Sequence, residues 1–146
     1  MKKLIIFSLV FLIISCSSPL PKPIPKCWND ICIHQAFALI DNNNLIIDFE
    51  LTKLDGTAEV GDSLRLRGKQ LVGAFLIKND KETYLFGVNS DLVCYQGNDI
   101  PWANGKYAAV CGIGIPMSQL SEKVNVGDII RVEFSFDFKQ LVRILR

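Results

Sequence analysis

Apolar side chains recur at every second position along much of this chain, and that period most strongly constrains its fold. In the segment 45–51 every odd-numbered residue is apolar, whereas Asp48 and Glu50 fall between them. The segment 130–137 alternates in the same way. Successive side chains of a strand point to opposite faces of its sheet. Both segments are therefore predicted to be strands with one packed and one solvent-exposed face, which places Asp48 and Glu50 in water.

The strand pattern extends to further short segments, which are 33–40, 63–67, 71–78, 83–89, 92–96, 106–115 and 140–145. Turn-forming segments such as Asp41-Asn42-Asn43-Asn44, Asn79-Asp80 and Asn104-Gly105 separate most of them. Nine short strands at this spacing predict an all-β domain, either an antiparallel Ig-like β-sandwich or a small barrel. A helical turn is expected within 116–124, where Pro116 suits the first helical position.

The composition agrees with one folded domain, which we place at 27–146. The chain has 146 residues, of which 49% are apolar, so it can build one core of useful size. The formal net charge of the whole chain is +1. A nucleic-acid-binding protein normally carries a clear cationic excess, so no nucleic-acid partner is expected.

The N-terminus has the features of an export signal. Lys2 and Lys3 precede an apolar run over 4–14 that Ser8 alone interrupts, which is too short to span a bilayer. The run ends in Ile13-Ile14-Ser15-Cys16, which resembles the lipobox of bacterial lipoproteins. The resemblance implies removal of residues 1–15 and attachment of diacylglycerol to the Cys16 sulfur, with a further acyl chain on its amine. The alternative is an ordinary secretory signal, but the usual A-x-A-like cleavage site is missing.

The same resemblance implies a place in the cell. Two or three acyl chains hold a protein on a membrane without a transmembrane helix. Ser17, directly after the lipidated cysteine, resembles the sorting residue of lipoproteins sent to the Gram-negative outer membrane. We therefore expect a lipid-anchored protein of the bacterial cell envelope.

A proline-rich linker follows the lipidated Cys16 and ends at residue 26. Its prolines stand at 19, 21, 23 and 25, and each ring favours extended backbone. At ~3.1 Å per residue, 17–26 would form a spacer of about 30 Å between lipid and domain. A PxxP ligand motif needs prolines three positions apart, which this two-residue spacing does not supply.

The remaining cysteines are Cys27, Cys32, Cys94 and Cys111, an even number in a chain predicted to reach an oxidising compartment. Two disulfides are expected, and three connectivities are open. We favour Cys27–Cys32 with Cys94–Cys111, because a hairpin of the strands around residues 94 and 111 sets the latter two opposite each other. A tight Asn104-Gly105 turn would pair residue 94 with residue 115, so this pairing needs a broad loop or a bulge.

Metal binding is the alternative use of the first cysteine pair. Cys27, Cys32 and His34 supply two sulfurs and an imidazole, and Asp30 stands nearby. The Cys-x4-Cys-x-His spacing matches no common zinc arrangement, and exported thiols are normally oxidised. We therefore expect no metal and no other cofactor.

The sequence lacks the residues of common catalytic sites. His34 is the single histidine, and apolar residues surround it on a predicted strand. No G-x-S-x-G, S-x-x-K, H-E-x-x-H or Walker sequence occurs. Asp48 and Glu50 resemble a glycosidase pair in type, but strand alternation already explains them. Gly112 and Gly114 are better explained by close packing or a bulge than by phosphate binding. We predict a protein that is not an enzyme.

Partner contacts are predicted from aromatic residues outside the core pattern. Trp28 lies between two cysteines, and Trp102 lies in the loop 98–105, with Tyr95 and Tyr107 on the flanking strands. Tryptophan and tyrosine are common anchors of binding surfaces, although a tryptophan beside a disulfide is also a packing pair. The favoured function is a binding or assembly accessory that holds an envelope protein or polymer. The alternatives are a surface-exposed inhibitor or defence module that captures a foreign protein and, third, a small envelope enzyme.

Overall fold

The computed structural model describes residues 19–28, 31–53, 70–96, 109–135 and 137–146. The signal segment, Cys16 and the strand candidate 63–67 lie outside these residues. The elements, in chain order, are β1 (Lys26–Trp28), β2 (Ile31–Asp41), β3 (Asn44–Lys53), β4 (Gln70–Lys78), β5 (Lys81–Ser90), β6 (Val93–Gln96), β7 (Ala109–Pro116), the 3-10 helix η3 (Met117–Gln119), β8 (Ile129–Phe134) and β9 (Phe138–Leu145).

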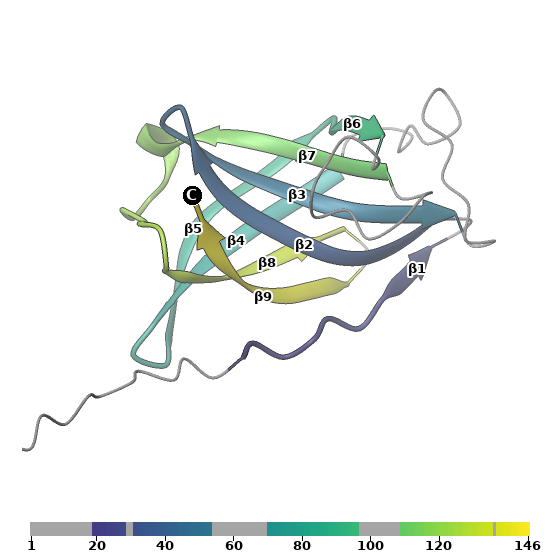
Figure 1. Ribbon diagram of the computed structural model, residues 1–146. Coiled ribbons are helices and arrows are strands. Elements are labelled where there is room, and N and C mark those ends of the chain that lie inside the picture. Colours follow the sequence, from purple (N-terminus) through teal and green to yellow (C-terminus); the bar gives the residue numbers. More distant parts are fainter. Residues whose placement is uncertain (1–18, 29–30, 54–69, 97–108, 136) are drawn as a thin grey trace, which may run out of the picture.

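The strands form one curled sheet in the order β5-β4-β8-β9-β2-β3-β7-β6, with β1 paired to β2 (Figure 1). The all-β prediction is confirmed, and the half-barrel shape fits the small barrel. The expectation of a strictly antiparallel sheet is wrong, because β2 and β9 run parallel at Ala38↔Ile144 and Leu39↔Leu145. The hairpin with β8 sets the direction of β9, so that β9 meets β2 in the parallel sense.

The core lies inside the curl. Leu45, Ile47, Phe49 and Leu51 have no exposed surface, as their alternation predicts. The ring of Phe49 meets those of Phe134 and Phe138 edge-on, with centroids 4.8 and 6.3 Å away. These contacts join β3 to the β8–β9 hairpin across the interior. Side chains therefore fill the inside of the half-barrel.

Two hairpins turn at the predicted asparagine and aspartate residues. Asn42 and Asn43 have φ of 45° and 64°, and Asn79 and Asp80 have φ of 49° and 59°. Positive φ at both central residues is the mark of a type I′ turn, whose twist matches that of the strands. Asn and Asp tolerate this conformation better than other side chains.

The predicted helical turn is shorter than expected. It covers three residues, Met117–Gln119, directly after Pro116. The backbone N–H of Ser121 then donates to the carbonyl oxygen of Leu85 at 3.0 Å. The chain leaves the helix because it binds to the edge of β5 at this point.

The proline-rich linker is shorter than its sequence predicts. Lys26 belongs to β1, where it pairs with Ile33 of β2. Residues 21–24 and Lys26 line a groove of about 330 Å³ together with residues of β8 and β9, such as Arg131 and Leu141. Lys26 therefore belongs to the sheet rather than to the predicted spacer, and residues 21–24 lie beside β8 and β9. The pairing of β1 aims the extended proline backbone along β9, as Figure 1 shows.

Both favoured disulfides are present, Cys27–Cys32 and Cys94–Cys111. Cys94 of β6 stands directly opposite Cys111 of β7. Gln96 pairs with Ala109, so β6 and β7 are not in the register that would pair residue 94 with residue 115. The predicted loop between them, 97–108, lies outside the described residues.

We expect the variant C94A/C111A to lose about 3 kcal/mol of unfolding free energy, because its disulfide closes a segment with a sequence separation of 17. The matched variant C27A/C32A, with a separation of 5, should lose about 2 kcal/mol. Urea unfolding monitored by circular dichroism measures both losses. A smaller loss for C94A/C111A than for C27A/C32A would contradict the loop-closure explanation.

Candidate functional site

A groove of about 500 Å³ opens on the outer face of the sheet, over β4, β5 and β8. We call it the outer groove. Its apolar lining consists of Leu71, Gly73, Phe75, Tyr84, Phe86, Gly87 and Phe134. Its polar lining consists of Glu133, Ser135, Asp137 and Lys139. The alternate residues of β4, namely Val72, Ala74 and Leu76, are buried in the core, so the groove lies on the face away from it.

Two glycines form the floor of the outer groove. Gly73 of β4 stands directly opposite Gly87 of β5. A Cβ at Gly87 would lie 3.1 Å from Tyr84 Oη, so the Tyr84 side chain lies over this glycine. A Cβ at Gly73 would come no closer than 3.6 Å to the described residues, at the Phe86 carbonyl oxygen. The groove is therefore open at Gly73, where its floor is formed by the backbone. Glycine in a strand often marks a position where a ligand approaches the backbone.

An aromatic pair borders this floor. Tyr84 and Phe75 are paired across β4 and β5, with ring centroids 5.7 Å apart at 73°. The guanidinium of Arg131 lies 4.4 Å from the centre of the Phe75 ring. Tyr84 is 53% exposed, although its ring packs against the Phe75 ring and over Gly87. A fixed and exposed aromatic side chain offers contact area at a low cost in conformational entropy.

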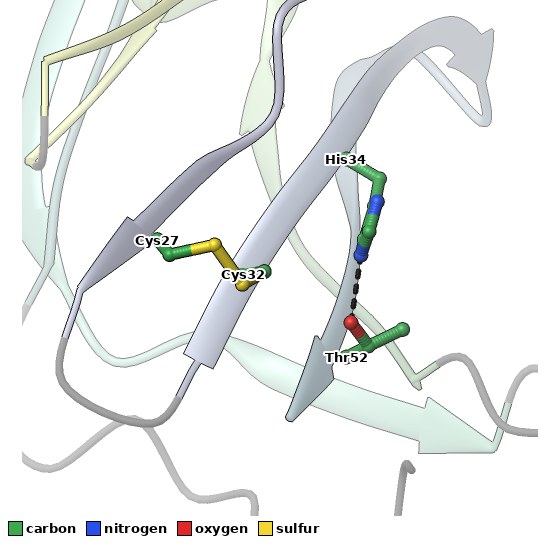
Figure 2. The surroundings of a disulfide bond; sticks show 4 residues. All are labelled: Cys27, Cys32, His34 and Thr52. Carbon is green, nitrogen blue, oxygen red and sulfur yellow. Dashed lines mark hydrogen bonds between the residues drawn. A yellow bond between two sulfur atoms is a disulfide. The ribbon is translucent and has the colours of Figure 1, made fainter. Parts of the chain in front are cut away.

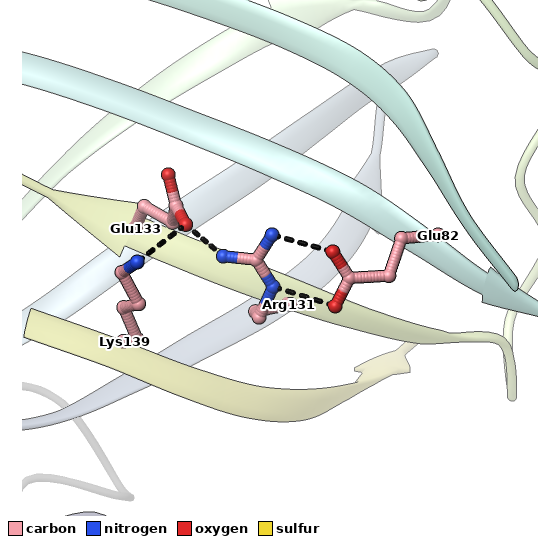
Figure 3. A network of polar contacts seen from close by, with 4 residues as sticks. All are labelled: Glu82, Arg131, Glu133 and Lys139. Atoms are coloured by element: carbon pink, nitrogen blue, oxygen red, sulfur yellow. Dashed lines mark hydrogen bonds and ion pairs between the residues drawn. The ribbon is translucent and has the colours of Figure 1, made fainter. Parts of the chain in front are cut away.

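A network of four charged side chains lies beside the aromatic pair (Figure 3). Arg131 donates through Nε and Nη2 to the two carboxylate oxygens of Glu82, at 2.9 and 2.6 Å. It also donates through Nη1 to Glu133, which Lys139 Nζ approaches to 3.4 Å. The hydrogen bond from Arg131 lowers the pKa of Glu82. Two cations and two anions balance, so this network carries no net charge.

The network connects the outer groove to the groove lined by the proline-rich segment. Asp137 and Lys139 line both grooves, and Arg131 lines the second one. Lys22 and Lys26 of the linker line the second groove as well. Polar side chains therefore run along the outer face from β8 to the linker.

The other half of the outer face overturns one sequence prediction. Glu50 is 5% exposed and accepts a hydrogen bond from Gln35 Nε2, so its predicted place in water is wrong. Asp48 is half-buried and lies over Gly112, where a Cβ would come 1.8 Å from Asp48 Oδ1. The prediction that Gly112 serves close packing is confirmed. Alternation identified the outer face correctly, but it cannot tell which parts of that face are covered.

His34 lies at an irregularity of β2, between the pairs Ile33↔Leu51 and Gln35↔Glu50. Its Nε2 atom is 2.6 Å from Thr52 Oγ1, close to the Cys27–Cys32 disulfide (Figure 2). Both sulfurs are bonded to each other, which rules out the thiolate ligands that the metal alternative requires. Within the described ranges, no group of three or more His, Cys, Asp or Glu residues is placed to hold a metal ion.

The aromatic residues predicted to bind partners are not brought together by the described part of the structure. The backbones of Trp28 and Tyr95 belong to β1 and β6, but their side chains lie outside the description. Trp102 and Tyr107 lie outside it entirely. Sequence reasoning missed the outer groove. The sequence feature that could have indicated the groove was a glycine inside each of two neighbouring predicted strands, beside the aromatic residues Phe75 and Tyr84.

Comparison of the chain with protein families, curated proteins and solved structures found no match. Over the residues that the structure describes, no helix combines the length and the apolar character that a membrane span requires.

Asp48→Asn should stabilise the protein at neutral pH. Burial raises the pKa of Asp48 above its ordinary value of 3.8, so the folded state holds this proton more tightly than the unfolded state. The contribution of Asp48 to stability is complete below pH 3.8 and is lost as the pH rises through the raised pKa. Asparagine keeps the shape and carries no charge.

Urea unfolding of both proteins at a series of pH values tests this expectation. The wild type should lose stability relative to Asp48→Asn as the pH rises. Asp91→Asn, which removes an exposed carboxylate, controls for the change in net charge. A wild-type protein that gains stability relative to Asp48→Asn over this range would contradict the expectation.

Proposed function

We propose that this protein is a lipid-anchored binding module of the bacterial cell envelope, held to the membrane through Cys16 and binding its ligand in the outer groove without catalysis. The observation that carries the binding role is the open floor at Gly73 beside the exposed and fixed ring of Tyr84. The lipobox resemblance supports the anchor. Two disulfides agree with an oxidising compartment outside the cytoplasm.

The packing of the interior supports a ligand site on the outside. Phe49, Phe134 and Phe138 meet inside the curl. In β-barrels with a wider interior, this space can hold a ligand. A ligand would have to displace these buried rings, which is costly in a closely packed core. The outer groove requires no such displacement.

The polar groups of the groove support binding rather than catalysis. A general acid or base needs a carboxylate that is free to exchange a proton with the substrate. Of the two carboxylates that line the outer groove, Glu133 and Asp137, Glu133 instead accepts a hydrogen bond from Arg131 and pairs with Lys139. His34 and Asp48 line neither of the two grooves. The paired charges suit the orientation of a ligand by hydrogen bonds.

The anchor is tested with Cys16→Ala. We expect this variant to incorporate no radiolabelled palmitate and to leave the membrane fraction, because its acylation site is gone. Ser18→Ala, two positions along, is the matched control and should behave as the wild type. Palmitate labelling of Cys16→Ala at the wild-type level would disprove lipidation at this residue.

The groove is tested by chemical crosslinking in intact cells, followed by purification of the full-length lipoprotein. Tyr84→Ala should recover about tenfold less of the crosslinked envelope component than the wild type, because it removes the exposed ring. Val93→Ala, which truncates another exposed apolar side chain that does not line the groove, should recover the wild-type amount. Equal recovery by the two variants would refute a role for the groove.

Trp102→Ala in the same crosslinking experiment tests the separate prediction of a contact in the loop 98–105. Recovery at the wild-type level would remove this loop from the binding surface. A loss that matches that of Tyr84→Ala would extend the surface beyond the outer groove.

A further inference from the structure

The geometry points to a saccharide as the ligand of the outer groove, an inference that rests on the binding role proposed above. We propose that a pyranose ring stacks on Tyr84 above Gly73, while its hydroxyl groups bond to the charged side chains alongside. This assignment names the class of ligand. The shape of the floor, the balance of charge and the position of the groove within the sheet each support it.

The shape of the floor suits a flat ring. Gly73 and Gly87 are neighbours across β4 and β5, and the Tyr84 side chain lies over Gly87. Among the described residues, a Cβ at Gly73 would meet only the Phe86 carbonyl oxygen within 4 Å. Phe75 holds Tyr84 from the side in an edge-to-face contact. A pyranose ring has an apolar face of C–H groups that packs on an aromatic ring, and equatorial hydroxyls that point outward. The open space at Gly73 leaves room for such a ring to approach the sheet.

The balance of charge favours a neutral ligand with many hydroxyl groups. Arg131 and Lys139 are both paired with Glu133, and Arg131 also binds Glu82. A phosphate group would have to compete with these carboxylates for each cation. Sugar hydroxyls both donate and accept, so they can add to the network without breaking it. Donors from Lys139 and acceptors from Glu133 and Asp137 line the same groove.

The position of the groove argues against a peptide bound as an added strand. Strand addition uses the free backbone groups of a sheet edge. The floor residue Gly73 belongs to β4, which pairs with β5 on one side and with β8 on the other. β5 is the edge strand of the sheet, but Ser121 already donates to the carbonyl oxygens of Tyr84 and Leu85 there. The floor at Gly73 therefore presents a sheet face rather than free backbone groups. A sugar ring that stacks on the face of a sheet needs no free backbone N–H or C=O groups.

Two sources in the envelope share this chemistry, the glycan strands of the cell wall and the saccharide part of a membrane glycolipid. The structure favours the pyranose ring common to both. The experiment therefore uses both sources as separate probes.

The test follows the backbone amide signals of Gly73 and Gly87 by nuclear magnetic resonance, on the full lipoprotein in detergent micelles. The probes are soluble glycan fragments released from bacterial cell wall by lysozyme, and lipopolysaccharide. A short inorganic polyphosphate and an extended decapeptide serve as comparison ligands. We expect at least one saccharide probe to shift both glycine signals in a saturable way, and neither comparison ligand to do so.

Gly73→Val is the decisive variant, because valine fills the open space and suits a strand, and its Cβ has ordinary contacts. It should weaken saccharide binding at least tenfold and keep the unfolding midpoint close to that of the wild type. Gly114→Val is the matched control on the outer face of β7, where a Cβ would lie 4.0 Å from its nearest described neighbours. This control should bind as the wild type does.

The outcomes separate the saccharide inference from the proposed binding role. Shifts with wall fragments alone, or with lipopolysaccharide alone, support the inference and identify the source. If no saccharide shifts the glycine signals while crosslinked recovery still depends on Tyr84, the saccharide inference is overturned and the binding role stands. The inference is also overturned if Gly73→Val and Gly114→Val bind the saccharide with equal affinity. If no saccharide shifts the glycine signals and Tyr84→Ala recovers the wild-type amount of the crosslinked component, both proposals fall.

Discussion

The contact of Phe49 with Phe134 and Phe138 is the interaction on which the rest of the structure depends. It brings β3 against the β8–β9 hairpin, which begins 76 positions after β3 ends. Burial of these rings curls the sheet and fills its interior. Because the interior is filled, the surface available to a ligand is the outer face. The place of the candidate site thus follows from how the core is packed.

The outer face acquires its chemistry from the same strand pairing. Register places Gly73 beside Gly87 on one side and beside Glu133 on the other. Two residues along β4, on the same face, Phe75 stands between Tyr84 and Arg131. A shift of the pairing register by one residue would turn these side chains into the core, where the charge of Arg131 would not be solvated. The buried residues of β4 and β8 therefore hold the aromatic pair and the ion network in place.

Much of the fold could be predicted from local patterns. The strands β2, β3, β4, β5 and β9 begin and end within two residues of their predicted bounds, because period-two alternation is a property of each segment by itself. β1 was missed, since three residues beside a proline-rich segment show no period. The burial of Glu50 was missed for another reason. Its cover and its partner Gln35 depend on how distant parts of the chain pack.

The sequence by itself determined the strand pattern, the asparagine turns and the favoured disulfides, because each depends on residues close in the chain or on the compartment that its N-terminus predicts. The tertiary structure decided the parallel contact of β9 with β2, the course of the linker and the outer groove. Arg131 and Glu82 are 49 positions apart, and Gly73 meets Gly87 across a hairpin whose register the alternation leaves open. Long-range pairing depends on the packing of the whole core, which no single segment of the sequence encodes.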